Sequence, residues 1–180
     1  MQQRHLNRRQ YFCELANTAR TFYMEYLNTY IKLTPDTRVL EIGCGEGGNL
    51  LPFAEKGCQV TGIDICQSRI IEAQTFFTEC HQQGTFICQD FLLTDEPKTE
   101  DERYALILVH DVIEHIEPSN KRDFLLHIKH FFKQDGIAFF GKFKSVAYYS
   151  AEFFWVHHHC IGRSYNHICI WILLEQLVGC

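Results

Sequence analysis

The sequence lacks the features of a secreted, membrane-spanning or general nucleic-acid-binding protein. It has no stretch of about 20 apolar residues, so we expect no integral membrane segment. The first ten residues contain no apolar core of the kind that a signal peptide needs. Nine cysteines are present without any Cys-x-x-Cys pair, which predicts reduced thiols and a cytoplasmic location rather than disulfides or a zinc site. A formal net charge of −5 argues against nucleic acid as a partner.

The length and composition instead indicate a single globular domain. The chain has 180 residues, of which 46% are hydrophobic and 14% aromatic. This is enough apolar material for a sizeable core and too much for a disordered chain. The question is then which stretch of the domain carries its chemistry.

A glycine cluster is the most informative stretch. Residues 38–48 read Arg-Val-Leu-Glu-Ile-Gly-Cys-Gly-Glu-Gly-Gly, and a helical pattern begins at Asn49. An aliphatic run, a glycine turn and a helix are typical of the start of a βαβ unit. Glycines leave room for a ligand against the main chain, and the N–H groups at the start of the helix face the same space. We therefore predict that a small molecule lies across this turn.

The charges around the turn discriminate between two classes of ligand. Gly43-x-Gly45-x-x-Gly48 fits a dinucleotide fingerprint, which leaves an NAD(P)-dependent oxidoreductase as one alternative. Glu41 and Glu46, however, would repel a pyrophosphate and attract a ligand that carries an ammonium and a sulfonium.

Residues 41–47 resemble the first motif of the class I S-adenosylmethionine-dependent methyltransferases. That motif is an acidic residue, one apolar residue and Gly-x-Gly-x-Gly, and the segment Glu-Ile-Gly-Cys-Gly-Glu-Gly fits it throughout. In that family the turn cradles the methionine half of the cofactor. The resemblance implies that S-adenosyl-L-methionine is held here by Glu41, Gly43, Cys44 and Gly45.

The second expected strand, residues 59–64, ends in an acid. Asp64 lies 23 positions beyond Glu41, and an acid about 20 residues past a glycine turn can accept hydrogen bonds from both ribose hydroxyls. A buried carboxylate is costly without such donors. Gly62-Ile63-Asp64-Ile65 also resembles the second motif of the family, which implies cofactor contacts for Asp64 and Ile65, although Cys66 stands where the family usually has a hydroxyl helix cap.

The third expected strand, residues 85–89, is followed by Asp90 and Phe91. In relatives an acid at this place commonly bonds the adenine amino group, with an apolar neighbour against the ring. The resemblance implies these two roles for Asp90 and Phe91. The alternative is that Asp90 only caps a loop.

The fourth expected strand, residues 104–109, is almost continuously apolar, as a strand buried on both faces of a parallel sheet should be. Ligands of open α/β sheets bind beyond the carboxyl ends of the strands, where the strand order reverses. The first and fourth strands flank that point in this topology. We therefore expect His110 and Asp111 to face the methyl group and its acceptor.

Asp111, Glu114 and His115 would share one face if they form a helical turn. His115 or Asp111 could then take a proton from the acceptor, and both are our candidate catalytic residues. The three could instead bind a divalent ion, since the ubiquinone-pathway O-methyltransferases show an acid-x-x-acid-His run here, with glutamate first. A third alternative is that the histidine only orients the loop. We predict no resident metal.

Helical patterns cover residues 4–31, about 68–81, and a segment that starts at Pro118. The first of them carries an apolar stripe that we expect to pack on the sheet, with a lid over the cofactor as the alternative. A turn at residues 134–136 should lead into a fifth strand at 137–140. The stripe consists of Phe12, Leu15, Ala19, Phe22, Tyr23, Tyr26, Leu27 and Tyr30.

The resemblance covers residues 36–141, the expected cofactor-binding core, between an N-terminal helical segment (1–35) and an atypical C-terminal segment (142–180). Residues 168–174 are nearly uncharged and could form a core helix on the fifth strand, and residues 157–160 have metal-binding side chains. Together the patterns predict an α/β, Rossmann-like, doubly wound and mainly parallel sheet with helices on both faces. The implied activity is methyl transfer to an oxygen, nitrogen or carbon of a small molecule, and the alternative is a non-catalytic or truncated relative.

Overall fold

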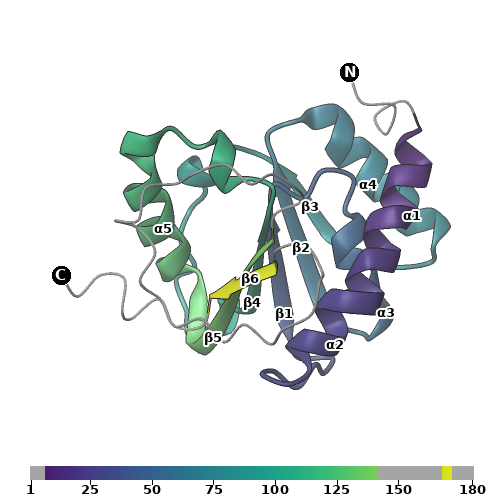
Figure 1. Ribbon diagram of the computed structural model, residues 1–180, viewed down its shortest axis with the longest axis horizontal. Coiled ribbons are helices and arrows are strands. Elements are labelled where there is room, and N and C mark those ends of the chain that lie inside the picture. The colour runs from purple at the N-terminus through teal and green to yellow at the C-terminus, as the bar shows by residue number, and fades with distance from the viewer. Residues whose placement is uncertain (1–6, 142–167, 172–180) are drawn as a thin grey trace.

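The computed structural model describes residues 7–141 and 168–171. Its centre is a six-stranded sheet in the order β3-β2-β1-β4-β5-β6 (Figure 1). The strands β1 to β5 are parallel, and β6 runs antiparallel to β5. The strand bounds are β1 Arg38–Ile42, β2 Gln59–Asp64, β3 Thr85–Cys88, β4 Tyr104–His110, β5 Phe132–Gly141 and β6 Ile168–Trp171.

Helices cover both faces of this sheet. The core under α1 to α4 and the core under α5 are two separate clusters of buried side chains, one on each face (Figure 1). A π-helical turn, Ala19–Tyr23, joins α1 to α2. The helix bounds are α1 Arg8–Thr18, α2 Met24–Leu27, α3 Leu51–Glu55, α4 Gln67–Glu79 and α5 Lys121–His130. Within the described residues, no helix has the length and apolarity to cross a bilayer.

Strand β4 supplies side chains to both clusters. Successive residues of a strand point to opposite faces. Leu106 and Leu108 accordingly lie in the cluster under α1 to α4, and Ile107 and Val109 lie in the cluster under α5. All four are at most 1% exposed, which confirms the prediction of a strand buried on both faces.

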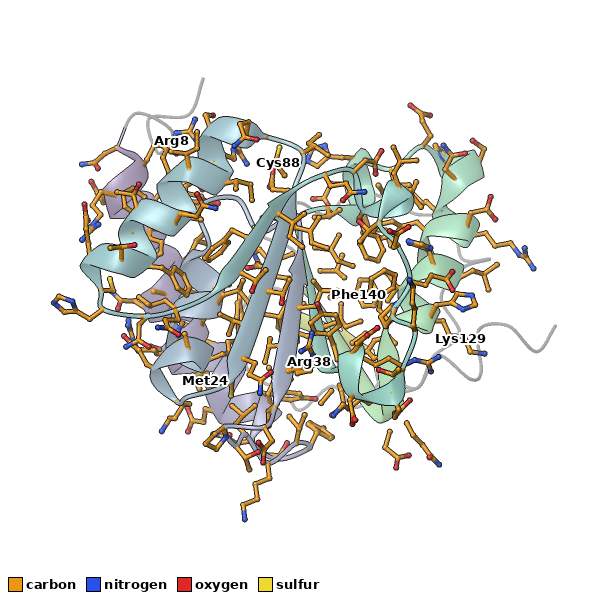
Figure 2. The ribbon with its side chains drawn as sticks, turned by 180° about the vertical axis from the view of Figure 1, so that it is seen from behind. Arg8, Met24, Arg38, Cys88, Lys129 and Phe140 are labelled. Carbon is orange, nitrogen blue, oxygen red and sulfur yellow. The ribbon has the colours of Figure 1, made fainter. Side chains whose placement is uncertain are left out.

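The carboxyl ends of the parallel strands meet along one edge of the sheet. Cys88 lies at this carboxyl end of the sheet, at the end of β3, and Arg38 lies at the opposite, amino end, at the start of β1 (Figure 2). The chain passes from β1 outward to β2 and β3, then returns to place β4 on the other side of β1. The strand order therefore reverses between β1 and β4, where such folds bind ligands. The doubly wound fold that the sequence predicted is confirmed.

The fifth strand differs from its prediction. The strand begins at Phe132, which pairs with Tyr104, whereas the next register pair is Leu106 with Ile137, so the expected turn residues form an irregularity within β5 and do not precede it. Phe132 is buried, which explains why the chain joins the sheet before this irregularity.

The segment 168–171 was expected in a core helix and is instead strand β6. It pairs antiparallel with residues 138–141 of β5, and this pairing satisfies backbone groups that an edge strand would leave open. The remainder of the C-terminal segment, including residues 157–160, lies outside the described residues.

The N-terminal stripe is half confirmed. Phe12, Ala19, Tyr23 and Leu27 are buried in the core under α1 to α4, as expected for packing on the sheet. Each of the other three aromatic residues of the stripe is more than a third exposed and so is not part of the core. These exposed residues are Phe22, Tyr26 and Tyr30.

Candidate functional site

The loop after β1 is fastened to β2 by its own backbone. The N–H groups of Gly43 and Cys44 both donate to the carbonyl of Ile63, at 2.8 and 3.1 Å. Gly45 has a φ of +52°, and a Cβ there would have no heavy atom closer than 3.8 Å, from Arg69. The loop therefore offers a backbone surface with open space in front of Gly45.

Asp64 holds the same loop by its carboxylate. Its Oδ2 accepts from the Gly45 N–H at 2.9 Å and its Oδ1 accepts from the Cys66 N–H at 2.8 Å. The residue is 8% exposed. Because a carboxylate oxygen can accept two hydrogen bonds, each oxygen retains acceptor capacity for a ligand hydroxyl while the backbone fixes its direction.

Glu41 lies buried at the end of β1, with 1% exposure. Its Oε1 accepts from Asn49 Nδ2 at 2.7 Å, and its Oε2 has no hydrogen-bond partner among the described residues. Burial raises the pKa of this carboxyl to about 8, with the Asn49 bond opposing the rise and the Asp64 charge adding to it. Glu41 therefore holds a proton at neutral pH, and a neighbouring cation would favour its loss.

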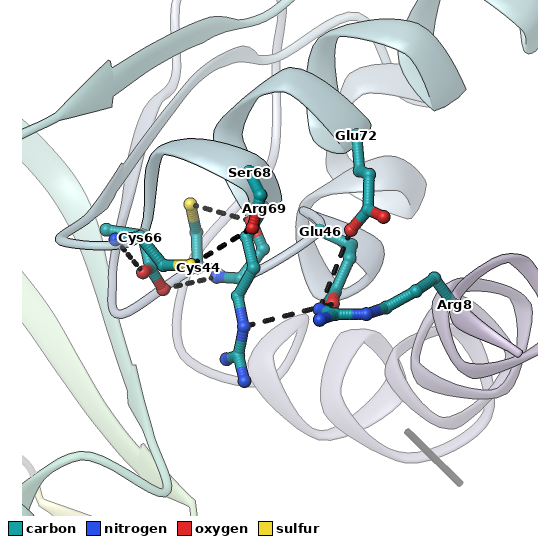
Figure 3. A network of polar contacts seen from close by, with 9 residues as sticks. Arg8, Cys44, Glu46, Cys66, Ser68, Arg69 and Glu72 are labelled. Carbon is teal, nitrogen blue, oxygen red and sulfur yellow. Dashed lines mark hydrogen bonds and ion pairs between the residues drawn. The ribbon is translucent and has the colours of Figure 1, made fainter. Parts of the chain in front are cut away.

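A network of four charged side chains closes the outer side of the loop (Figure 3). Glu46, which is 2% exposed, is paired with Arg8 from α1. Arg69 Nε lies 4.0 Å from Glu46 Oε1, and Arg8 also lies 3.6 Å from Glu72 of α4. The charge of Glu46 is thus compensated by arginines. The negative charge available to a ligand comes from Asp64, and from Glu41 once a neighbouring cation has favoured the loss of its proton, which corrects the expectation that Glu46 attracts the ligand.

The side chains of Cys44 and Ile65 point in opposite ways. Cys44 is 3% exposed, so it contributes only its backbone to the surface of the loop. The same burial raises the pKa of its thiol. Ile65 is 76% exposed beside Asp64. An exposed isoleucine at this edge gives a ligand an apolar surface.

Asp90 and Phe91 follow β3 as expected, with different surroundings. Asp90 is exposed, and its Oδ1 accepts from the Leu92 N–H at 3.0 Å, so it caps the turn Phe91–Leu93. Phe91 is 4% exposed and packs its ring against His127 and Phe131, both with centroids 4.9 Å away. The ring belongs to the core under α5, and the adenine contacts expected of both residues stay predictions.

The segment after β4 begins with a left-handed residue. Asp111 has a φ of +51°, and its N–H donates to the Gly141 carbonyl at 3.0 Å. The following helical turn starts only at Ile113, so the shared helical face expected for Asp111, Glu114 and His115 is not formed. His115 is exposed. Over residues 7–141 and 168–171, no three His, Cys, Asp or Glu side chains gather in a way that could hold a metal ion.

His110, the last residue of β4, is 9% exposed. Its Nδ1 lies 3.3 Å from Tyr23 Oη, and its Nε2 lies 3.5 Å from Asp111 Oδ2. Burial lowers the pKa of the imidazole, while the charges of Asp111 and Glu114 oppose that shift. The side chain is directed to the N-terminal helix, and the cofactor contact expected of His110 stays a prediction.

Sequence reasoning missed two residues of this site. Asn49 gave a faint signal, since it is a polar residue within the first turn of an otherwise apolar helix. Tyr23 gave none, because its helical spacing in the N-terminal stripe is also that of an ordinary core residue.

The domain has a Rossmann-like fold, as its strand order, the glycine loop after β1 and the acids at the ends of β1 and β2 show. The chain also matches the methyltransferase-domain family over residues 8–171. It belongs to that family.

Two curated relatives show how far the similarity extends along the chain. The ubiquinone biosynthesis O-methyltransferase of Rickettsia felis is 29% identical over 117 residues, which are 65% of this chain and 46% of that protein. The enzyme of the same name from Rickettsia typhi is 32% identical over 119 residues, which are 64% of this chain and 46% of that protein. The chain therefore spans about half the length of the curated relatives it matches.

Solved structures show the same fold. PKMT2 from Rickettsia typhi in complex with AdoHcy has a TM-score of 0.56 and 26% identity, over 64% of this chain and 24% of that one. The PH0226 protein of Pyrococcus horikoshii has a TM-score of 0.60 and 23% identity, over 76% of this chain and 56% of that one. The second likeness concerns the fold alone.

Proposed function

We propose that this chain is an S-adenosyl-L-methionine-dependent methyltransferase that acts on a small-molecule acceptor. One observation carries the proposal: the buried Glu41, at the end of β1 before the glycine loop, has an oxygen, Oε2, without a hydrogen-bond partner among the described residues, and Asp64 stands at the same edge. A ligand with an ammonium and hydroxyl groups satisfies both, whereas a pyrophosphate would be repelled by the Asp64 carboxylate.

Each side chain has a distinct part in holding the cofactor. Glu41 faces its ammonium, and the two oxygens of Asp64 accept from the ribose hydroxyls while still bound to the N–H groups of Gly45 and Cys66. The backbone at Gly45 lets the ligand approach closely. Asp90 faces the adenine amino group, and the exposed Ile65 lies against the ring.

The acceptor side lies beyond β4. The cofactor supplies an electrophilic methyl group whose carbon–sulfur bond breaks as the acceptor atom bonds to the carbon. The protein mainly positions the two reactants. Asp111 or His115 takes the proton that an acceptor hydroxyl or amine loses. We place these parts in one domain, with residues 36–141 as the cofactor-binding core.

A non-catalytic relative is the second candidate, because the helical face expected to be shared by Asp111, Glu114 and His115 is not formed. Such a protein would bind the cofactor without turnover.

Isothermal titration calorimetry tests the proposal. We expect S-adenosylmethionine and S-adenosylhomocysteine to bind and NAD and NADP not to bind. Absence of binding by the folded protein would reject the proposal. Binding of NAD or NADP, without binding of S-adenosylmethionine or S-adenosylhomocysteine, would favour an oxidoreductase. Binding without turnover on a panel of small phenols, amines and carboxylic acids would favour the non-catalytic relative. His115→Ala should keep binding, since His115 is exposed and away from the loop contacts. Its turnover distinguishes the two candidate bases, because a loss would assign the proton to His115 and wild-type turnover would assign it to Asp111.

A second prediction concerns the space in front of Gly45. In Gly45→Ala the added Cβ has room in the protein but occupies space in which the cofactor would lie. The left-handed backbone should cost about 1–2 kcal/mol, and affinity for S-adenosylhomocysteine should fall at least about tenfold, or about 1.4 kcal/mol. Calorimetry and thermal melting give the two values.

Gly57→Ala is the matched control. Gly57 also has a positive φ, +85°, and a Cβ there would meet only Pro35, at 3.7 Å. It should lose similar stability and keep its affinity. Equal affinities for the two variants would place the cofactor away from Gly45.

A further inference from the structure

A buried tyrosine connects the N-terminal helix to the acceptor side of the site. Tyr23 and His110 are 3% and 9% exposed. They are 87 positions apart in the sequence, and their side chains meet at 3.3 Å between Oη and Nδ1. The other ring nitrogen lies 3.5 Å from the carboxylate of Asp111. The side chains of Tyr23, His110 and Asp111 thus form a continuous line from the N-terminal helical segment to the candidate catalytic carboxylate.

The donor inventory indicates the direction of the Tyr23–His110 hydrogen bond. His110 Nε2 makes no hydrogen bond among the described residues, but it lies 3.5 Å from the Asp111 carboxylate, and a carboxylate, which only accepts, favours the tautomer with the hydrogen on Nε2. A neutral imidazole has one N–H, so Nδ1 is an acceptor and the Tyr23 hydroxyl donates to it. Burial lowers the pKa of His110 and raises that of Tyr23, which keeps the ring neutral and the hydroxyl protonated.

The backbone reinforces this arrangement. A Cβ on Gly141 would lie 2.2 Å from His110 Nδ1, so the imidazole rests directly on the backbone of β5. The Gly141 carbonyl also accepts the N–H of Asp111, whose φ is +51°. A non-glycine residue stays in this conformation only where its surroundings enforce it. The strain is located at the end of the Tyr23–His110–Asp111 line.

The helix that supplies Tyr23 is itself irregular. Tyr23 is the last residue of the π-helical turn Ala19–Tyr23. Such turns are rare in proteins, and those that do occur inside helices are often found at functional sites. The tyrosine ring also packs on Phe139 of β5, with centroids 4.8 Å apart.

We propose that Tyr23 and His110 are positioning residues that fix the orientation of the Asp111 carboxylate for proton acceptance. This inference rests on the methyltransferase function proposed above. In the step it serves, the acceptor atom bonds to the methyl carbon, the sulfur keeps the electron pair of the broken bond, and the acceptor proton passes to Asp111. Other titratable groups that act electrostatically on the line are Tyr11 from α1, Glu41 from β1 and Glu114.

The tautomer of His110 is the decisive readout, because it needs no acceptor. In the ¹⁵N-labelled full chain, long-range ¹H–¹⁵N spectra near pH 7 should show His110 neutral, with the proton on Nε2. Tyr23→Phe removes the donor to Nδ1, so the two tautomers should mix and the Nδ1 resonance should shift. A charged ring, or an Nδ1–H tautomer in the wild type, would overturn the proposal.

Tyr26→Phe is the matched control, since it is the same substitution on α2. The Tyr26 hydroxyl is paired with Tyr30 at 2.9 Å, so the His110 spectrum should stay that of the wild type. Melting temperatures within about 5 °C of wild type show that both variants fold.

Turnover separates positioning from binding. On any acceptor that the wild type methylates, Tyr23→Phe should lower kcat about tenfold and keep the affinity for S-adenosylhomocysteine within about twofold, while Tyr26→Phe should change neither. A wild-type kcat in Tyr23→Phe would contradict the proposal. If the wild type binds no S-adenosylhomocysteine, the proposed function fails, while the spectra still decide whether the Tyr23–His110 hydrogen bond has the stated direction.

Discussion

Replacing Glu41 with glutamine should stabilise the chain against heat and, at the same time, weaken its binding of S-adenosylmethionine. Both effects follow from the burial of this carboxyl, whose pKa is about 8 in the folded chain. Glutamine keeps an oxygen that can accept from Asn49, as Oε1 does now. It has no proton to lose.

The sign of the stability effect comes from the two pKa values. The unfolded chain ionises Glu41 near pH 4.5, and the folded chain ionises it near 8. The contribution of Glu41 to stability is therefore complete below pH 4.5 and is lost as the pH rises to 8. At pH 7 this loss amounts to about 3 kcal/mol, because each unit of pKa difference corresponds to about 1.4 kcal/mol. Glu41→Gln should recover it, with a rise in melting temperature of roughly 6–12 °C.

The sign of the binding effect is the opposite. The cofactor ammonium favours the ionised form of Glu41, so binding at pH 7 should release close to one proton. A hydrogen bond to a charged group contributes about 1.5–3 kcal/mol, and below pH 8 part of this is spent on removing the proton. Glu41→Gln should thus weaken binding about 100-fold at pH 9 and about tenfold at pH 7.

Calorimetry in buffers of different ionisation enthalpy measures the proton release, and melting curves from pH 5 to 9 measure the stability. Glu25→Gln, on the exposed side of α2, should change neither. If Glu41→Gln melts at the wild-type temperature at pH 8 and binds the cofactor normally, then Glu41 is neither protonated in the fold nor in contact with the ligand.

The sequence predicted the elements whose cause is local. Strand β2 ends at Asp64 as expected, because an apolar run and the acid that closes it lie next to one another in the chain. The helix α4 buries Ile70, Ala73 and Phe77, as its periodicity indicated. The position of Asp64 at the edge of the glycine loop could be predicted for the same reason.

Other features depend on contacts that local sequence does not encode. The partner of Glu46 is Arg8, 38 positions away, and nothing in the loop itself indicates that its charge is compensated. Phe91 turns inward because His127 of α5 and Phe131, which follows that helix, pack against its ring, although the preceding Asp90 is exposed.

Removing the carboxylate of Asp64 should have the other large effect, and it should reduce stability and binding together. In Asp64→Ala the buried N–H of Gly45 and the part-buried N–H of Cys66 lose their acceptor. A buried loss costs about 1–3 kcal/mol, and the part-buried one costs less because water can replace the acceptor, so we expect a destabilisation of roughly 2–5 kcal/mol. Affinity for S-adenosylhomocysteine should fall more than about 100-fold, or about 2.7 kcal/mol, since the ribose acceptors and the support of the loop disappear at once.

Asp90→Ala separates this double role from that of an acid which only ends a strand. Asp90 also follows a strand and accepts a backbone N–H, from Leu92, but it is exposed and holds no part of the glycine loop. Its loss should cost about 1 kcal/mol of stability and about tenfold in affinity. Urea unfolding and calorimetry on both variants make the comparison. Asp64 binds the loop through Oδ2 and the start of α4 through Oδ1. If Asp64→Ala keeps wild-type affinity, the loop neither needs this carboxylate nor receives the cofactor. Equal losses in the two variants would remove the distinction between a carboxylate built into the loop and one at its rim.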